Sequence, residues 1–196
     1  MKLAIFFDRD GTINEEVGYI RNLDDMKLIA GAGAALKSVN EAGFLAILAT
    51  NQSGPARGYY DETWIEKLHE RLELLLADEG ARLDDIYYCP HLPDGTVPAY
   101  SGVCRCRKPE VGMLEDAANK WNLDLNRSYM IGDKATDVEA GQKAGCKTIL
   151  LRSGYGAQVL AGTYQWPCTP SFIANDIFEA VAWALADAGR RLDACE

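Results

Sequence analysis

The sequence predicts an α/β fold, in which one doubly wound, mostly parallel sheet carries helices on both faces and residues 1–196 form a single domain. Short, continuously apolar runs alternate along the chain with longer segments whose apolar residues recur at helical spacing. Strands separated by helices form parallel βαβ units. Polar side chains directly follow three of the apolar runs, and ligand sites of such sheets lie outside the carboxyl ends of the strands.

The predicted strands are apolar runs bounded by polar residues or glycine. A run without polar alternation is typical of a parallel strand that is buried on both faces. This pattern is clearest in the first two runs and is repeated in three further short ones. The predicted strands are residues 3–7, 44–49, 85–89, 129–131 and 147–151.

Helices are predicted between these runs from their periodicity and from the residues that begin and end them. Gly43 lies just past the end of one helix, where glycine is favoured, and Asp61 is a suitable N-cap for the next. Pro109 is expected in the first turn of another, where its ring fits. The predicted helices are residues 32–42, 61–79, 109–122, 135–144 and 175–188.

Composition limits the classes of function. A net charge of −9 disfavours binding along a nucleic-acid backbone, which requires clustered Lys and Arg, but it allows a small phosphorylated substrate. The first apolar run ends at Asp8 after five residues, far short of the roughly 18 of a membrane span. We therefore expect a cytoplasmic monomer that acts on a small molecule and has no nucleic-acid or membrane partner.

Three predicted strands deliver polar groups to one edge of the sheet. The first is followed by DRDGT (8–12), the second by TNQS (50–53) and the fourth by GDK (132–134). Asp8 and Asp10 are two residues apart in extended chain, so their side chains can face the same way. Together with Asp133 they form a cluster of hard oxygen ligands suited to Mg²⁺. The alternative is that these carboxylates only cap and solvate the strand ends.

A carboxylate in such a cluster can attack a phosphoryl group and form an aspartyl-phosphate. Mg²⁺ and a lysine can neutralise the phosphoryl oxygens, and the rest of catalysis is alignment. Asp10 would donate a proton to the leaving alkoxide and then activate water on the intermediate.

Four segments, FFDRDGT, TNQSG, CRKP and IGDKATD, resemble in this order the four motifs of the haloacid dehalogenase (HAD) superfamily of phosphatases, over about residues 3–155. The resemblance implies a Rossmann-like HAD domain with Asp8 as nucleophile and Asp10 as acid and base. Thr50 would stabilise the phosphoryl group, with Lys108 as its positive partner. The implied Mg²⁺ ligands are Asp8, the Asp10 backbone carbonyl and Asp133, supported by Asp137.

A loop at residues 89–108 gathers soft metal ligands. Its spacing, C-x-H followed by C-x-C, supplies a complete Cys₃His set for structural Zn²⁺ at Cys89, His91, Cys104 and Cys106. Such a site would fix the cations of Arg107 and Lys108, which follow directly. The alternative is a set of inert, reduced cysteines. Cys146, Cys168 and Cys195 lack partner spacing, and His69 is expected to be solvated.

No cap domain of ordinary size fits between the motifs, so the expected site is open and its specificity comes from short loops. A capless member with this zinc loop resembles two subfamilies. One removes the 7-phosphate of D-glycero-D-manno-heptose 1,7-bisphosphate on the way to lipopolysaccharide heptose, and the other hydrolyses histidinol phosphate. The first fits TNQSGPARG and NEEVGYI better. It implies substrate contacts at Glu16, Val17, Gly18, Tyr19, Thr50, Asn51, Gln52, Ser53, Arg107, Lys108 and Lys134.

Other interpretations remain open at this point. Arg107 can hold a second phosphate bidentately, or it is a surface cation beside Glu110. Lys134 is either a substrate contact or a surface residue at a helix start. As a whole, the chain is alternatively a histidinol-phosphate phosphatase or a catalytically silent, zinc-stabilised binding protein. A polynucleotide end-phosphatase is disfavoured by the acidic composition.

Overall fold

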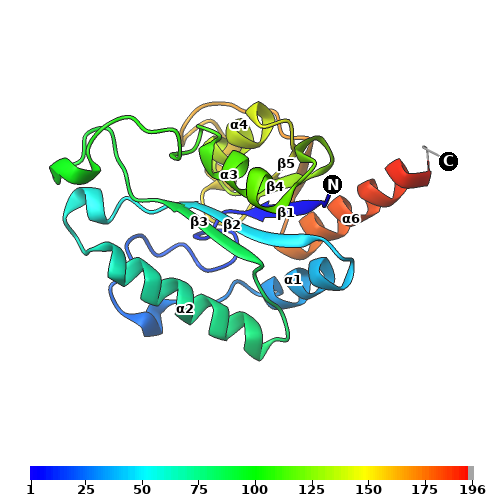
Figure 1. The fold of residues 1–196 in the computed structure, drawn as a ribbon, viewed down its shortest axis with the longest axis horizontal. Coiled ribbons are helices and arrows are strands. Elements are labelled where there is room, and N and C mark those ends of the chain that lie inside the picture. The colour runs from blue at the N-terminus through cyan, green and yellow to red at the C-terminus, as the bar shows by residue number, and fades with distance from the viewer. Residues whose placement is uncertain (194–196) are drawn as a thin grey trace.

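A computed structural model describes residues 1–193, and the side chains of residues 1–189, so Cys195 lies outside the described residues. The strands form one six-stranded sheet in the order β3-β2-β1-β4-β5-β6, and every neighbouring pair is parallel (Figure 1). This confirms the predicted fold class. The strands are β1 (Ala4–Phe7), β2 (Leu45–Asn51), β3 (Asp85–Cys89), β4 (Tyr129–Gly132), β5 (Lys147–Leu151) and β6 (Phe172–Ala174).

Helices cover both faces of the sheet, as Figure 1 shows: α1, α2 and α6 lie on one face, and α3 and α4 on the other. The short α5 follows β5 and packs beside α4 and β5. The helices are α1 (Ala32–Glu41), α2 (Glu62–Asp78), α3 (Gly112–Trp121), α4 (Ala135–Lys143), α5 (Gly156–Leu160) and α6 (Ile177–Asp193).

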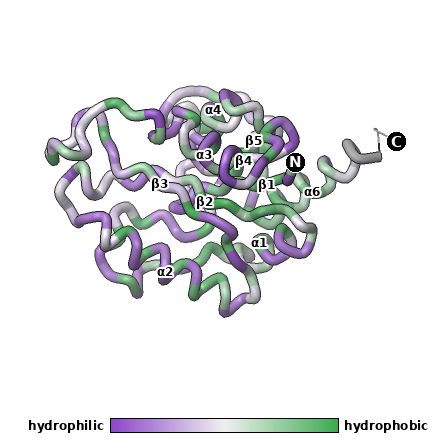
Figure 2. The backbone as a smooth tube through the Cα atoms, in the orientation of Figure 1, coloured by the Kyte–Doolittle hydropathy of each residue, from purple (hydrophilic) through white to green (hydrophobic). Residues whose placement is uncertain are grey.

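The core lies on both faces of β1. All four of its residues are buried; Ile5 and Phe7 pack into the cluster with α1, α2 and α6, whereas Ala4 and Phe6 pack into the cluster with α3. Figure 2 shows the apolar colour concentrated along the central strands. Burial on both faces explains why this strand is apolar without alternation.

Several predicted element ends are confirmed. Asp61 is the N-cap of α2, and its Oδ1 accepts a hydrogen bond from Trp64 N at 3.2 Å. Gly43 lies just past α1 with a φ of +77°, which a side chain would disfavour. Asp85 to Cys89 is a strand as predicted.

The prediction for Pro109 is wrong, because α3 begins three residues later at Gly112. The chain first makes a turn in which Glu110 N donates to Arg107 O and Gly112 N to Arg105 O, both at 2.8 Å. These two hydrogen bonds stabilise the turn in which the side chain of Lys108 is buried. The sequence analysis also missed α5 and β6, since each is too short to show a period.

No cap domain is inserted between the motifs of the described chain. Between the first and second motifs lie a 3₁₀ turn at Leu23–Asp25 and α1, and between the second and third lie α2, β3, two 3₁₀ turns and the loop at residues 90–108. The edge that carries the motifs is therefore bordered by loops. None of the helices within residues 1–193 is long and apolar enough to cross a membrane.

Candidate functional site

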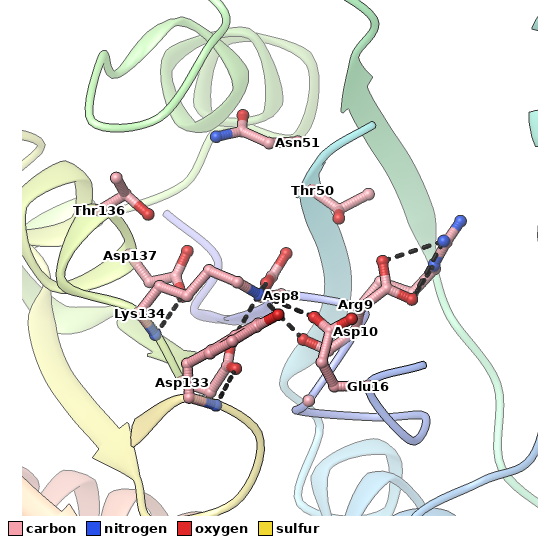
Figure 3. A network of polar contacts seen from close by, with 12 residues as sticks. Asp8, Arg9, Asp10, Glu16, Thr50, Asn51, Asp133, Lys134, Thr136 and Asp137 are labelled. Atoms are coloured by element: carbon pink, nitrogen blue, oxygen red, sulfur yellow. Dashed lines mark hydrogen bonds and ion pairs between the residues drawn. The ribbon is translucent and has the colours of Figure 1, made fainter. Parts of the chain in front are cut away.

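The carboxyl ends of three strands meet at the centre of the sheet. Because β1 lies between β2 and β4, Asp8, Thr50 and Asp133 are delivered side by side to one edge, and α4 starts there with Lys134 at its N-cap (Figure 3). The order of the strands, which the sequence does not state directly, thus brings together residues more than a hundred positions apart.

Asp8 lies between two lysine side chains. Its Oδ1 is 3.0 Å from Lys108 Nζ, and its Oδ2 is 3.2 Å from Lys134 Nζ. Burial alone would raise the pKa of Asp8, but the two ammonium groups outweigh burial and hold this pKa below its ordinary value. The buried carboxyl therefore remains an anion, which is the form that a nucleophile requires.

Lys108 is held in place from three directions. Its Nζ donates to Ala49 O at 2.6 Å and pairs with Asp137 Oδ1 at 2.7 Å, in addition to its contact with Asp8. Its backbone exchanges two hydrogen bonds of 3.0 Å with the side-chain amide of Asn51 at the end of β2. Burial would lower the pKa of Lys108, but Asp137 and Asp8 raise it above the ordinary value.

Lys134 lies where three oxygen atoms converge. Its Nζ is 3.2 Å from Asp8 Oδ2, 3.2 Å from Asp10 O and 3.0 Å from Asp133 Oδ1. These are the three ligands that the family resemblance implies for Mg²⁺, so the ammonium group stands in for a cation at the point where they meet. A set of two carboxylates and a carbonyl fits the oxygen chemistry that Mg²⁺ requires.

The pKa of Asp133 reflects its burial and the negative charge of the carboxylates around it, Asp8 and Asp137. Burial raises its pKa to about 7, and the carboxylates of Asp8 and Asp137 act in the same direction against Lys134. Gly11, with a φ of +82°, and Gly154 both pack against its carboxylate, where any side chain at either position would collide with Oδ2. A divalent cation would relieve the repulsion among these carboxylates. The side-chain oxygens of Asp8, Asp133 and Asp137 lie within 4.8 Å of one another.

Asp10 is oriented by three neighbours, of which Arg9 and Asn14 were not predicted as site residues and Gln52 was predicted only as a substrate contact. Arg9 is buried and binds the Asp10 carboxylate with two nitrogens at 2.9–3.1 Å. Asn14 Nδ2 donates to Oδ1 at 2.9 Å, and Gln52 Nε2 donates to Oδ2 at 2.8 Å. Gln52 also donates to Thr50 Oγ1 at 3.0 Å, which links the proposed acid to the proposed phosphoryl contact. Arg9 directly precedes Asp10 in the sequence, and this adjacency could have predicted their ion pair.

A cavity of about 460 Å³ contains most of the predicted site residues. Of the predicted catalytic, substrate-binding and Mg²⁺-binding residues, three do not line it: Thr50 and Asp133 are buried, and Val17 is exposed. The predicted residues that line the cavity are Asp8, Asp10, Glu16, Gly18, Tyr19, Asn51, Gln52, Ser53, Arg107, Lys108 and Lys134. Sequence analysis missed others that line it, namely Thr136, Tyr155, Tyr164, Gln165 and Trp166.

Two loops shape the rim of the cavity. Glu16 Oε1 accepts a hydrogen bond from Gly18 N at 2.8 Å, which folds the loop after β1, and the hydroxyls of Tyr19 and Ser53 lie 3.2 Å apart. Arg107 donates from Nη1 to His91 O at 2.9 Å. Its guanidinium therefore lines the cavity while attached to the cysteine loop, and Glu110 pairs with Lys143 instead.

The four predicted zinc ligands form one compact cluster. The three sulfur–sulfur distances are 3.0, 3.3 and 3.5 Å, and His91 Nδ1 lies 3.6 Å from Cys89 Sγ and 3.4 Å from Cys106 Sγ. In a tetrahedral zinc site with Zn–S bonds of about 2.3 Å, two sulfurs are ~3.8 Å apart. The sulfurs lie closer together than this, and the donor types are those of a structural zinc site, with all four positions supplied by protein.

The expectation for His69 is wrong. The side chain is buried at 6% exposure on α2, and its ring lies 5.5 Å from the ring of Tyr88. His69 is one helical turn from both Ile65 and Leu72, so it belongs to the buried stripe of the helix. Burial, reinforced by the charge of Arg9, lowers the pKa of His69 to about 3.

Comparisons with known proteins agree with this geometry. A family model described as "HAD-hyrolase-like" matches residues 105–180. The D-glycero-D-manno-heptose-1,7-bisphosphate 7-phosphatase of Thermosynechococcus vestitus is 50% identical over 184 residues, which cover 92% of this chain and 94% of that protein. The D-glycero-beta-D-manno-heptose-1,7-bisphosphate 7-phosphatase of Escherichia coli is 45% identical over 152 residues, covering 77% and 80% of the two chains.

A solved structure has the same fold over almost its whole length. It is the D,D-heptose 1,7-bisphosphate phosphatase of B. bronchiseptica in complex with magnesium and phosphate, with a TM-score of 0.82, 32% identity, and coverage of 95% of this chain and 99% of the other. The high identity over nearly the full chain, together with the order of the four motifs, shows the family. The chain belongs to the HAD-like phosphatases, in the family of the heptose-1,7-bisphosphate 7-phosphatases.

Proposed function

We propose that this protein is a Mg²⁺-dependent phosphatase that hydrolyses the C7 phosphate of D-glycero-D-manno-heptose 1,7-bisphosphate through an aspartyl-phosphate on Asp8, in the supply of heptose for lipopolysaccharide. The names of the relatives at 45–50% identity support the substrate. One observation carries the chemistry: a cavity-lining carboxylate is held as an anion between Lys108 and Lys134, beside Asp133.

In the first half of the reaction, a carboxylate oxygen of Asp8 attacks the C7 phosphorus. The new bond joins Asp8 to phosphorus, the bond from phosphorus to the C7 oxygen breaks, and the proton of Asp10 passes to that oxygen. Arg9, Asn14 and Gln52 hold the Asp10 carboxyl in one orientation for this transfer. The dephosphorylated sugar then leaves.

In the second half, Asp10 accepts a proton from water as the water oxygen attacks phosphorus, and the bond from Asp8 to phosphorus breaks to release phosphate. Lys108 and the Thr50 hydroxyl would hold the phosphoryl oxygens in both halves, a role that the contact of Lys108 with Asp8 supports. Mg²⁺, held by Asp8, Asp133 and the Asp10 carbonyl, would supply charge neutralisation between the two anions that must approach each other.

We also propose that Zn²⁺ binds Cys89, His91, Cys104 and Cys106 and acts as a structural brace. The hydrogen bond from Arg107 to His91 O connects this cluster to the cavity. Arg107 is then available to hold the second phosphate of a bisphosphate, because a guanidinium binds phosphate through two parallel hydrogen bonds. Monomeric assembly and a cytoplasmic location stay predictions, and gel filtration tests the first.

A phosphate-release assay with Mg²⁺ tests the function. The panel compares heptose 1,7-bisphosphate, fructose 1,6-bisphosphate, histidinol phosphate and a 5′-phosphorylated oligonucleotide. We expect the heptose compound to have the highest kcat/KM and to lose only its C7 phosphate, as followed by phosphorus NMR. Preference for histidinol phosphate would overturn the substrate, and release without Mg²⁺ would overturn the metal dependence.

A further inference from the structure

The segment that follows β5 contributes an aromatic side to the catalytic cavity. Tyr155, Tyr164, Gln165 and Trp166 all line the cavity that contains Asp8. None of them lies in the four motifs. We call Tyr155, Tyr164 and Trp166 the aromatic wall.

The aromatic wall begins at the catalytic edge of the sheet. Tyr155 N donates to Asp133 Oδ2 at 2.8 Å, and Lys134 Nζ lies 5.5 Å from the centre of the Tyr155 ring. Tyr164 stacks on Tyr155 with ring centres 4.2 Å apart and planes inclined by 12°. The rings of Tyr155 and Tyr164 therefore pack on each other, and the backbone of Tyr155 is hydrogen-bonded to Asp133, a candidate metal ligand.

Gln165 turns the chain between this stacked pair and Trp166. Its φ of +56° is in the left-handed region, which residues other than glycine rarely adopt. Its Oε1 accepts a hydrogen bond from Thr136 N, 3.4 Å away near the start of α4. Unfavourable backbone conformations of this kind persist where the surroundings hold them, and they cluster at ligand sites. Here the turn presents Trp166, which lines the cavity and keeps 42% of its surface exposed.

The exposed indole contrasts with the other lining groups, which include Arg57, Arg107 and the carboxylates. The cations suit the phosphates of a bisphosphate, whereas the body of a sugar needs other partners, which Tyr19 and the aromatic wall can supply. The carbon-bound hydrogens of a sugar ring present an apolar surface that packs on an aromatic face. Within residues 1–193 no cap domain lies between the motifs that could supply such a surface.

We propose that the aromatic wall, with Trp166 as its principal contact, binds the sugar ring of the substrate and sets the preference for a phosphorylated sugar over smaller phosphate esters. This inference rests on the proposed function and assigns the sugar-recognition role to the chain after β5. In this way the aromatic wall covers one side of the bound sugar, which a cap domain would otherwise cover.

The test compares kcat/KM for heptose 1,7-bisphosphate with kcat/KM for acetyl phosphate, which has no ring. In Trp166→Ala we expect the ratio of the two to fall about 5- to 10-fold, through a higher KM for the sugar, because aromatic contacts contribute on that scale. Trp166→Phe should restore most of the ratio. Phe178→Ala removes an exposed aromatic side chain from α6, away from the cavity, and should leave the ratio unchanged.

Direct binding separates recognition from catalysis. In an Asp8→Asn background, which blocks turnover, adding Trp166→Ala should raise the Kd for heptose 1,7-bisphosphate by the same 5- to 10-fold factor in calorimetry. An unchanged Kd, or equal losses with both substrates, would overturn the inference while the function stands. Failure of the unmodified protein to hydrolyse the heptose compound would instead overturn the proposed function, and the inference with it.

Discussion

Within residues 1–189, whose side chains the structure describes, there are two clusters of potential metal ligands, and they are built in opposite ways. The carboxylate cluster draws Asp8 and Asp133 from the ends of two strands, contains the ammonium groups of Lys108 and Lys134, and borders a cavity. The cysteine cluster draws all four ligands from residues 89–106, and these ligands contact one another. The first leaves room for a substrate, whereas the second satisfies a metal completely. An open, charge-rich cluster suits chemistry, and a closed one suits bracing.

The largest expected effect comes from the carboxylate cluster. Asp8→Asn removes the nucleophile but keeps the size of the side chain, so turnover of heptose 1,7-bisphosphate should fall on the order of 10⁴-fold or more. Phosphate release measures this change. Asp94→Asn alters an exposed carboxylate in the cysteine loop and should keep full turnover. If Asp8→Asn works at more than a tenth of the normal rate, Asp8 is not the nucleophile.

The next effect tests whether the cysteine cluster is only a brace. Cys104→Ser should raise KM about 10-fold by displacing Arg107, since small misplacements of binding groups are costly, with a smaller change in kcat. Hydrogen exchange should become faster in residues 90–108 but not in the strands. The matched control is Cys168→Ser, a cysteine outside the cluster. Unchanged KM and exchange after loss of the metal would contradict the brace.

A third variant examines the cation at the centre of the carboxylate cluster. Lys134→Met leaves Asp8 and Asp133 without their shared ammonium, so Tm without Mg²⁺ should fall by about 5 °C or more. The rise in Tm on adding Mg²⁺ should exceed that of the unmodified protein, because the metal no longer displaces a lysine. Lys143→Met, which removes surface ion pairs with Glu139 and Glu110 at the end of the same helix, should change neither value. If Mg²⁺ raises the Tm of Lys134→Met and of the unmodified protein equally, the Lys134 ammonium group and the metal do not compete for one position.

The smallest expected effect is a pH dependence of folding stability that arises from His69, outside both clusters. The pKa of His69 is about 3 in the folded chain and near 6.5 in the unfolded one, so protons bind preferentially to the unfolded state between these values. Stability is therefore lost as pH falls below about 6.5, by about 1–2 kcal/mol at pH 5. His69→Phe should remove this part of the loss in urea unfolding at pH 7.5 and 5. If the unmodified protein and His69→Phe lose the same free energy of unfolding between pH 7.5 and 5, the pH dependence arises from other groups.

Local pattern was enough to predict much of the fold and of the site. Strands β3 and β5 were predicted with the bounds that the structure has, because each is a short run of mostly apolar residues that begins at a polar residue; β5 is largely buried, whereas β3 is half-buried at the edge of the sheet. The Cys₃His set was visible because its ligands are close in sequence. The strand β6 was missed since three residues, one of them exposed, leave no pattern. Pro109 was misplaced because its preference for a helix start says nothing about the turn that Lys108 requires.

By itself, the sequence determined the approximate position of every described strand except β6 and of every described helix except α5, since periodicity and residue type report the local environment of each position. Its assignment of the chemistry to particular side chains stays a prediction. Only the tertiary structure decided that Lys134 lies among three metal-ligand oxygens, that Arg9 binds Asp10, and that Trp166 borders the cavity. These relations depend on strand order and on the path of loops, which bring distant residues together. No local spacing encodes such contacts, because they arise from how the elements pack around one shared core.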